Sequence, residues 1–293
     1  MSSAITKPVE LLMSISNHLV AILAGGLIAA GTAAGAQDYY SKNVGVMKHI
    51  PGGTFQRDSN PANLSSLREF RLCTTEVTTA VFAMVMGYDP RKTDMIGLSE
   101  PAGEISWNEA ISFCNKLSVL EGLTPFYTIN PDNPNNYATV SDWSANGYRL
   151  PTETEWMWAA IGADLENPGD INRTGYLKKF AGDTGSNTID ECAVYKGETA
   201  EHTCFTPKLP NELGLYHMSG SRWEMCWDLF SANPPEGELF NHTGPAASEI
   251  KVFAHVLRGA SVNNTAAECS VLSRIGVLYN RIGYNMGFRV ARN

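Results

Sequence analysis

Cysteine, histidine and serine are the residue types here that could do redox, metal or nucleophilic chemistry, and their spacing favours none of these. The six cysteines are scattered without any C-x-x-C pair, so no zinc-site pattern is present. Ser261 lacks the G-x-S-x-G context of a hydrolase nucleophile, and no histidine has a paired acid in a local motif. We expect reduced or buried thiols, with Cys192 and Cys204 as the one pair to check for a disulfide.

Residues 256–290 form the most informative part of the chain. They open with Arg258-Gly259-Ala260-Ser261 and close with Gly287-Phe288-Arg289, two signals of fixed backbone geometry. Between these ends the apolar residues follow neither the period of a strand nor that of a helix. A framed segment without a pattern is typical of exposed loops held by a scaffold, and such loops often carry function.

Composition and charge restrict the class of protein. Of the 293 residues 43% are hydrophobic and 18% charged, which allows a sizeable core and argues against global disorder. The formal net charge is −8 and no basic stripe occurs, so we expect no nucleic-acid partner.

Residues 1–46 are expected to be a separate N-terminal hydrophobic segment. Its apolar run at 19–36 has no charge and ends in Ala34-Gly35-Ala36, which fits an A-x-A cleavage site. The run is barely long enough to span a bilayer, and its many Gly and Ala residues also suit a structural helix. The segment is therefore either a signal or membrane anchor, or a structural helix. The first alternative predicts an exported protein at the cell surface or outer membrane.

The globular part, residues 47–293, is predicted to have few regular elements. Residues 47–55 read as a strand, a Pro-Gly turn and a second strand. Alternating apolar and polar residues predict a strand over 70–77, and a short helix should follow over 79–86.

Two capping boxes predict two more helices. Ser106–Glu109 should begin a helix that ends at Gly122, and Thr152–Glu155 should begin another. Residues 162–210 and 233–248 are rich in Gly, Asn, Asp, Thr or Pro, so we expect long ordered loops there.

Four motifs occur in order along the globular part: IPGGTF at 50–55, GYRLPTETEW at 147–156, NELGLYHMSGSRWEM at 211–225, and RGAS at 258–261 with GFR at 287–289. Together they resemble the formylglycine-generating-enzyme (sulfatase-modifying-factor) domain, a subtype of the C-type lectin fold. The resemblance implies an α+β fold that is rich in loops, with few helices and short antiparallel strands. We expect Trp156, Trp158, Trp223 and Trp227 to pack in its core.

The resemblance also indicates where catalysis would occur. The family's enzymes bind copper and carry out the oxidation with two cysteines in a sequence similar to R-G-G-S-x-x-C-x-x-x-x-C. Here the two positions are Asn264 and Cys269. Because an amide supplies neither a thiolate nor a soft metal ligand, we do not expect formylglycine-generating activity. Cys269 is expected to be a small buried hydrophobe.

A calcium site of the family maps onto His217, Gly220, Arg222 and Glu224. Histidine replaces a hard oxygen ligand there, which disfavours calcium. We therefore expect no cofactor, with calcium at these four positions as the alternative.

The C-terminal segment is similar to the variable proteins of diversity-generating retroelements, in which randomised codons alter a C-terminal repeat. The frame residues kept here are Arg258, Ser261, Cys269, Arg274, Arg281, Gly287, Phe288 and Arg289. Adenine randomisation of AAC or AAT codons cannot produce Lys, Gln, Glu, Met or Trp. Between Val262 and Asn285 the only such residue is Glu268.

This similarity implies a monomeric, non-enzymatic, receptor- or adhesin-like protein that binds an unknown macromolecule, expected to be a protein. Tyr279 and Tyr284 would be the anchors, because tyrosine offers a large rigid contact at low entropic cost. A structural or accessory module of the same fold is the alternative, and an active oxidase is a more remote one. The expected contact positions are Val262, Asn263, Asn264, Thr265, Ala267, Ser270, Leu272, Ile275, Gly276, Val277, Leu278, Tyr279, Ile282, Gly283, Tyr284 and Asn285.

Arginines recur through the segment, at Arg258, Arg274, Arg281 and Arg289. A guanidinium carries five donors in a rigid fork, which suits it to joining carbonyls and carboxylates of neighbouring loops. We predict that at least two of the four are buried and hydrogen-bonded to such groups. The rival hypothesis, a basic ligand-facing patch, predicts that all four are exposed.

Overall fold

The computed structural model describes residues 37–92, 97–130, 132–133, 138–140, 143–196 and 208–293. Within these ranges no helix has the length and apolar character that crossing a membrane requires. The apolar run at 19–36 lies outside the described residues, so the predictions for it stay predictions.

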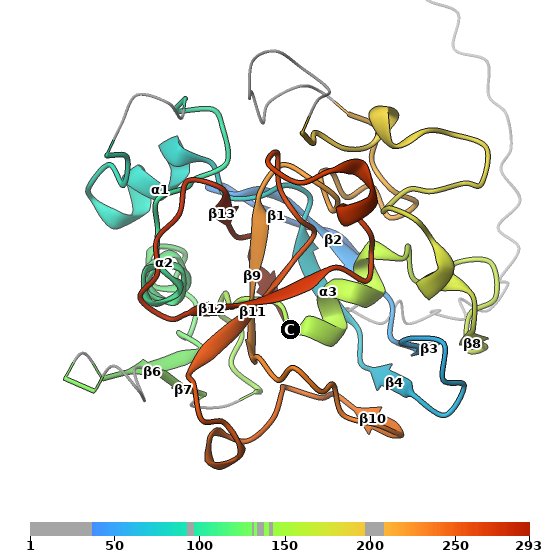
Figure 1. The fold of residues 1–293 in the computed structure, drawn as a ribbon. Helices are drawn as coiled ribbons and strands as arrows, with labels where there is room; N and C mark the ends of the chain where they lie inside the picture. Colours follow the sequence, from blue (N-terminus) through green and yellow to red (C-terminus); the bar gives the residue numbers. More distant parts are fainter. Residues whose placement is uncertain (1–36, 93–96, 131, 134–137, 141–142, 197–207) are drawn as a thin grey trace, which may run out of the picture. The chain divides into compact units, whose positions relative to one another are not determined.

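The first of three four-stranded sheets joins the two ends of the described chain (Figure 1). Its order is β1 (Tyr39–Ser41), β2 (Gly45–Ile50), β5 (Phe70–Cys73) and β14 (Ala291–Arg292). All of its pairs are antiparallel. Because β1 pairs with β2, the folded part begins at Tyr39, ahead of the start expected near Met47.

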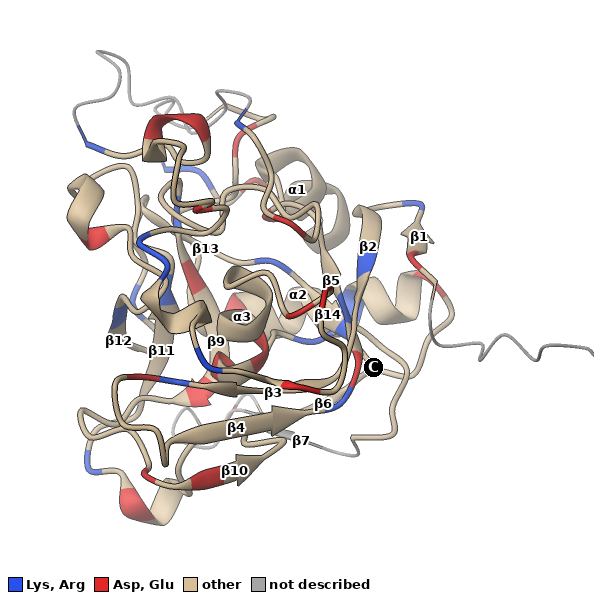
Figure 2. Ribbon diagram, turned by 90° about the vertical axis from the view of Figure 1, so that its right-hand side faces the viewer, with Lys and Arg blue, Asp and Glu red and all other residues tan. Residues whose placement is uncertain are grey.

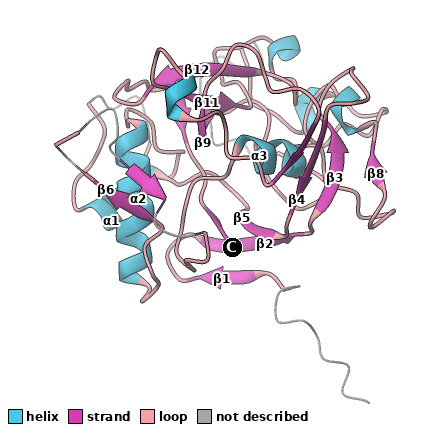
Figure 3. Ribbon diagram, turned by 90° about the horizontal axis from the view of Figure 1, so that it is seen from below, coloured by secondary structure: helices cyan, strands magenta, loops and turns pink. Residues whose placement is uncertain are grey.

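The second and third sheets contain most of the remaining strands (Figure 3). The second has the order β10 (Glu238–Phe240), β4 (Leu64–Leu67), β3 (Gly53–Gln56) and β8 (Ile171–Asn172). The third has the order β12 (Arg274–Leu278), β11 (Ala254–Arg258), β9 (Trp223–Leu229) and β13 (Met286–Gly287). A small hairpin pairs β6 (Tyr127–Ile129) with β7 (Ala138–Val140).

Most strand pairs in the described residues are antiparallel, as expected, and three pairs are parallel. β4 with β10, β3 with β8, and β9 with β13 are parallel. Parallel neighbours need long connections between them, and the long loops of this chain supply these. In addition, the turn at Pro51–Gly52 leads from the first sheet into the second, because β2 and β3 pair with different neighbours.

In the described ranges, each of the three α-helices begins at a hydroxyl cap. The helix α1 (Thr79–Met86) follows Thr78, α2 (Trp107–Leu120) follows Ser106, and α3 (Glu153–Ala160) follows Thr152. Both predicted capping boxes are formed, at Ser106 with Glu109 and at Thr152 with Glu155. These side chains satisfy backbone N–H groups that the first turn leaves without partners, so local sequence determines where the helices start.

Two apolar clusters form the core, one around α2 and β9, the other around α3 and β3. Trp156, Trp158 and Trp223 are buried as expected. Trp227 is half-buried and stacks on Tyr127 with ring centroids 5.1 Å apart. The third sheet therefore rests on packed aromatic rings, and the segment 256–290 runs through it.

Candidate ligand-binding site

Arg289 anchors the end of the segment inside the protein. Its side chain is fully buried and donates Nε and Nη2 to Glu224, at 2.7 and 2.5 Å. The same guanidinium donates to the carbonyls of Cys73, Thr74 and Tyr216. A buried bidentate ion pair with further hydrogen bonds fixes both the position and the orientation of the Arg289 side chain. The C-terminal end of the segment is therefore held rigidly.

Arg258 and Arg274 share one carboxylate, that of Glu153 at the start of α3. Arg274 Nε donates to Glu153 Oε1 at 2.7 Å, and Arg258 Nε lies 2.9 Å from the same oxygen. Arg258 also donates to the carbonyl of Val271, and Arg274 to that of Ser231. Burial opposes ionisation of Glu153, but the two guanidiniums outweigh it and lower the pKa of Glu153. This cluster holds β11 and β12 against α3.

The prediction for the arginines is confirmed, because Arg258 and Arg289 are buried and bonded to carbonyls and acids. Arg274 is partly buried, whereas Arg281 is exposed. A further arginine, the buried Arg222, donates to the carbonyl of Tyr284 and so holds the last loop of the segment.

The residues between these arginines divide into exposed and buried positions. Large apolar side chains stand in solvent at Leu272 (41% exposed), Ile275 (41%), Leu278 (48%) and Tyr284 (45%). Among the other expected contact positions Thr265, Ala267 and Gly276 are exposed, while Asn263, Asn264, Ser270, Tyr279, Ile282, Gly283 and Asn285 are half-buried. The expectation was wrong for Val262 and Val277, which are buried at 2% and 8% and pack in the interior.

The two ends of the exposed stretch meet. Asn263 Nδ2 donates to the hydroxyl of Tyr284 at 2.7 Å, across 21 positions in sequence. Tyr279 differs from Tyr284, since it is half-buried and packs against the core. Tyr284 is therefore the accessible tyrosine of the expected pair. We use the term segment surface for Leu272, Ile275, Leu278 and Tyr284.

The positions of the family's two copper-binding cysteines do not fit copper. Asn264 Oδ1 accepts from the hydroxyl and the backbone N–H of Ser261, at 2.8 and 3.1 Å. Cys269 is fully buried, and burial raises the pKa of its thiol to about 12. A two-thiolate site cannot form from an amide and a protonated thiol, and no step can be derived through copper here.

The four calcium positions do not fit calcium either. Both carboxylate oxygens of Glu224 accept from Arg289, and Oε2 also accepts from Trp156 Nε1 at 2.9 Å. His217 Nδ1 faces Glu76 at 3.7 Å, so an imidazole stands where the family has an Asn or Asp oxygen. A Cβ on Gly220 would lie 2.2 Å from the carbonyl oxygen of Val194, so that turn is closed by main chain. The ion pair of Glu224 and Arg289 replaces the metal as the organising charge.

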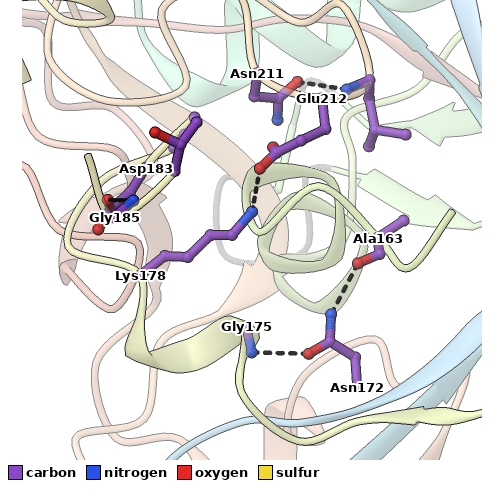
Figure 4. Close-up of polar contacts among 12 residues, drawn as sticks. Ala163, Asn172, Gly175, Lys178, Asp183, Gly185, Asn211 and Glu212 are labelled. Atoms are coloured by element: carbon purple, nitrogen blue, oxygen red, sulfur yellow. Dashed lines mark hydrogen bonds and ion pairs between the residues drawn. The ribbon is translucent and has the colours of Figure 1, made fainter. Parts of the chain in front are cut away.

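A cavity of about 630 Å³ lies elsewhere, between the loop that follows α3 and the loop from Gly175 to Gly185 (Figure 4). Its polar groups are engaged with one another. Lys178 pairs with Glu212, and Gly185 N donates to Asp183. Asn172 donates to the carbonyl of Ala163 at 2.8 Å and accepts from Gly175 N at 2.7 Å. These contacts hold loops together and bring no nucleophile and base into contact.

Sequence reasoning missed the acids that hold the segment, Glu153 and Glu224. Glu153 was visible only as part of a capping box and Glu224 only as a calcium candidate. A signal was available in the sequence. The motifs at 147–156 and 211–225 each contain an acid, and the motifs at 258–261 and 287–289 contain arginines that could pair with those acids. For Cys192 and Cys204, Cys192 is a buried free thiol and Cys204 lies outside the described residues.

The short mixed sheets, three helices and long bonded loops define the formylglycine-generating-enzyme type of the C-type lectin fold. Residues 36–293 match the sulfatase-modifying factor enzyme 1-like domain, and the chain belongs to this family. The fold is similar to that of Treponema denticola variable protein 1, with a TM-score of 0.69, 27% identity, and coverage of 84% of this chain and 94% of that one. PvdO from Pseudomonas aeruginosa, at 18% identity and a TM-score of 0.60, covers 88% of this chain and 98% of its own and shares the fold.

Two relatives show the functional range of the family. Chaperone protein LppX of Paenibacillus barcinonensis is 31% identical over 213 residues, which cover 62% of this chain and 71% of that protein. The formylglycine-generating enzyme of Streptomyces coelicolor is 28% identical over 191 residues, or 59% of this chain and 57% of the enzyme. The family therefore includes both enzymes and proteins named for other roles, and the site must decide between them.

Proposed function

We propose that this protein is an exported, monomeric binding protein without oxidase activity, which presents the segment surface to a protein ligand. The observation that carries the proposal is the division of the segment 256–290. Three of its four arginines, Arg258, Arg274 and Arg289, are tied inward to Glu153 and Glu224. The side chains of Leu272, Ile275, Leu278 and Tyr284 remain exposed. A fixed backbone with replaceable outward side chains is what a binding scaffold needs, because pre-ordering reduces the entropic cost of association.

The chemistry of the segment supports binding over catalysis. Asn264 and the protonated Cys269 occupy the positions at which the oxidase needs two thiolates. Exposed leucine, isoleucine and tyrosine side chains give apolar contact area, and aromatic anchors of this kind contribute strongly to protein interfaces. The similarity to a treponemal variable protein supports the same proposal.

Site-specific photo-crosslinking in cells that express the protein tests this proposal. A crosslinking phenylalanine analogue at position 284, and separately at position 278, should form covalent adducts with a protein. The control is the same analogue at Leu177, which is 63% exposed and lies outside the segment. Adducts of equal yield at all three positions, or at 177 alone, would contradict the proposal.

An accessory role is the second candidate, and the similarity to a protein named a chaperone favours it. Such a protein would bind clients through a surface that does not vary among sibling genes. A reverse-transcriptase gene and a template repeat beside this gene, with adenines at the codons of the segment surface, would favour a diversified ligand-binding protein. Their absence, together with crosslinks to one client, would favour the accessory role.

A further inference from the structure

A second, smaller cavity of about 230 Å³ lies beside the segment. Its walls come from six elements, with Phe55 on β3, Leu229 on β9, Leu239 on β10, Met157 on α3, Arg258 on β11 and Arg274 on β12. Figure 2 shows β3 and β10 on one side of α3 and β11 and β12 on another. Sites for drug-sized ligands measure about 300–1,000 Å³. This cavity therefore has room for one side chain or a small fragment.

The charges around the cavity are unbalanced. Three guanidiniums line it, those of Arg57, Arg258 and Arg274, against two carboxylates, those of Asp58 and Glu153. Arg57 donates to Ser65 and to main-chain carbonyls such as that of Pro235, at 2.9 Å. In the part of the chain that the structure describes, none of its hydrogen bonds goes to an acid. The excess charge in a partly closed space favours an anionic guest, since screening is weak away from bulk water.

The neighbouring acid Asp228 does not restore the balance. It is buried and accepts from the backbone N–H of Glu153 at 2.8 Å. Burial, and then the charge of Glu153, raise the pKa of Asp228 well above its usual value. The ionised form of Asp228 is therefore disfavoured beside the cavity.

One donor of Arg258 faces a weak acceptor at the cavity wall. Arg258 Nη2 lies 3.7 Å from the sulfur of Met157, although the arginine is only 5% exposed. A thioether sulfur accepts hydrogen bonds weakly, whereas a carboxylate forms short, charge-assisted bonds with guanidinium. An entering carboxylate would thus give this donor a much better partner.

The rest of the wall is mostly apolar, with Thr154, Ser231 and His242 as its further polar residues. Phe55 is buried and stacks on Trp158, and Met157, Pro234, Pro235 and Leu239 complete the surface. We propose that this cavity binds an apolar group of side-chain size that carries a carboxylate, with the carboxylate at Arg258 and Arg274. An aromatic carboxylic acid and the C-terminal phenylalanine of a protein share this chemistry. Leu272 belongs both to the segment surface and to the wall of the cavity. The proposal for the cavity nevertheless does not depend on what the segment surface binds.

Calorimetric titration with 3-phenylpropionate and with its neutral amide tests the charge requirement. The acid should saturate one site and bind about tenfold more tightly than the amide, because a charge-assisted hydrogen bond is lost in the amide. Peptides ending in phenylalanine, with a free or an amidated terminus, form a second pair. Binding of the free peptide above the small acid assigns the site to a protein terminus, and the reverse order assigns it to a free acid.

Variants locate the binding. Leu239→Trp should fill the cavity from its rim and abolish binding of the acid, while Leu278→Trp, on the exposed face of β12, should leave it unchanged. Unaltered melting temperatures would show that both variants are folded. Equal binding of acid and amide, no binding of either acid, or retained binding in the folded Leu239→Trp variant would overturn the proposal. These outcomes leave the crosslinking at position 284 unaffected.

Discussion

At the scale of single residues, a few buried acids organise the segment. Glu153 holds two arginines of the third sheet, and its own backbone N–H is held by Asp228. Glu224 holds Arg289 through a second ion pair. Removing one partner of such a pair would leave an uncompensated buried charge, which costs about 3–5 kcal/mol. The ion pairs that hold the segment are thus internal.

Asp228 predicts a measurable pH dependence. Its folded-state pKa is raised well above 3.8, first by burial, so the folded protein keeps a proton that the unfolded chain has lost. Stability should then fall as pH rises above 3.8 towards the raised value, by up to about 1.4 kcal/mol per pH unit. Asp228→Asn removes this titration and keeps an oxygen that can accept from Glu153 N.

The variant should therefore gain stability over the wild type as pH rises from acid to neutral, with little difference below the unfolded pKa. Urea unfolding of both proteins across this range measures the difference, and the most acidic point is the internal control. A variant that is less stable than the wild type at neutral pH would show that Asp228 is ionised in the folded protein.

At the scale of elements, tight turns bring the strands of the third sheet to their partners. Gly220 has φ +74° and lies where the chain passes Val194 before β9. Its N–H donates to the carbonyl of Gly259 at 2.8 Å, and Ser221 N donates to that of Val194 at 2.8 Å. The first bond joins the turn before β9 to the turn after β11, where the segment leaves the sheet, and the second joins the same turn to the chain at Val194.

Replacing Gly220 by alanine should therefore destabilise the protein strongly. The positive φ alone costs a non-glycine residue about 1–2 kcal/mol. At Gly220 the added Cβ would also lie 2.2 Å from Val194 O, which should bring the total to about 3 kcal/mol or more. Gly237 is a matched control, with φ +77° and nothing within 4 Å of the added Cβ. Chemical denaturation of both variants measures the difference, and equal losses would refute the close approach.

At the scale of the whole molecule, the two ends of the described chain meet in one sheet. β1 pairs with β2, β2 with β5, and β5 with β14, so residues 39 to 292 close on themselves. The segment between β11 and β14 is thereby tied down at both ends. Its exposed side chains can change without loosening the core, provided that they carry little of the stability.

Replacement of Leu272, Ile275, Leu278 and Tyr284 together by serine tests that separation. Exposed substitutions usually change stability by about 0.5 kcal/mol or less each, so the sum should stay within about 2 kcal/mol. Trp223→Ala, at a buried position, should cost about 3–5 kcal/mol by itself. Thermal and urea unfolding compare the two. A quadruple variant as unstable as Trp223→Ala would make these four positions part of the core and end the binding-surface assignment.

The sequence by itself determined the features that depend on contacts between residues close in the chain. The capping boxes at Ser106 and Thr152 satisfy donors within three residues, so both helices begin where their sequence places them. The four ordered motifs identified the fold. The inward role of the arginines also followed from sequence, because loops without a ladder need donors with many hydrogen bonds.

Only the tertiary structure decided which acids those arginines meet and which side chains face solvent. Arg274 and Glu153 are 121 positions apart, and Arg289 and Glu224 are 65 apart. Val262 and Val277 lie in the same unpatterned stretch as Leu278, yet they are buried. Glu224, which its motif made a calcium candidate, forms an ion pair with Arg289. Burial and ion pairing depend on contacts between distant parts of the chain, and local patterning does not specify those contacts.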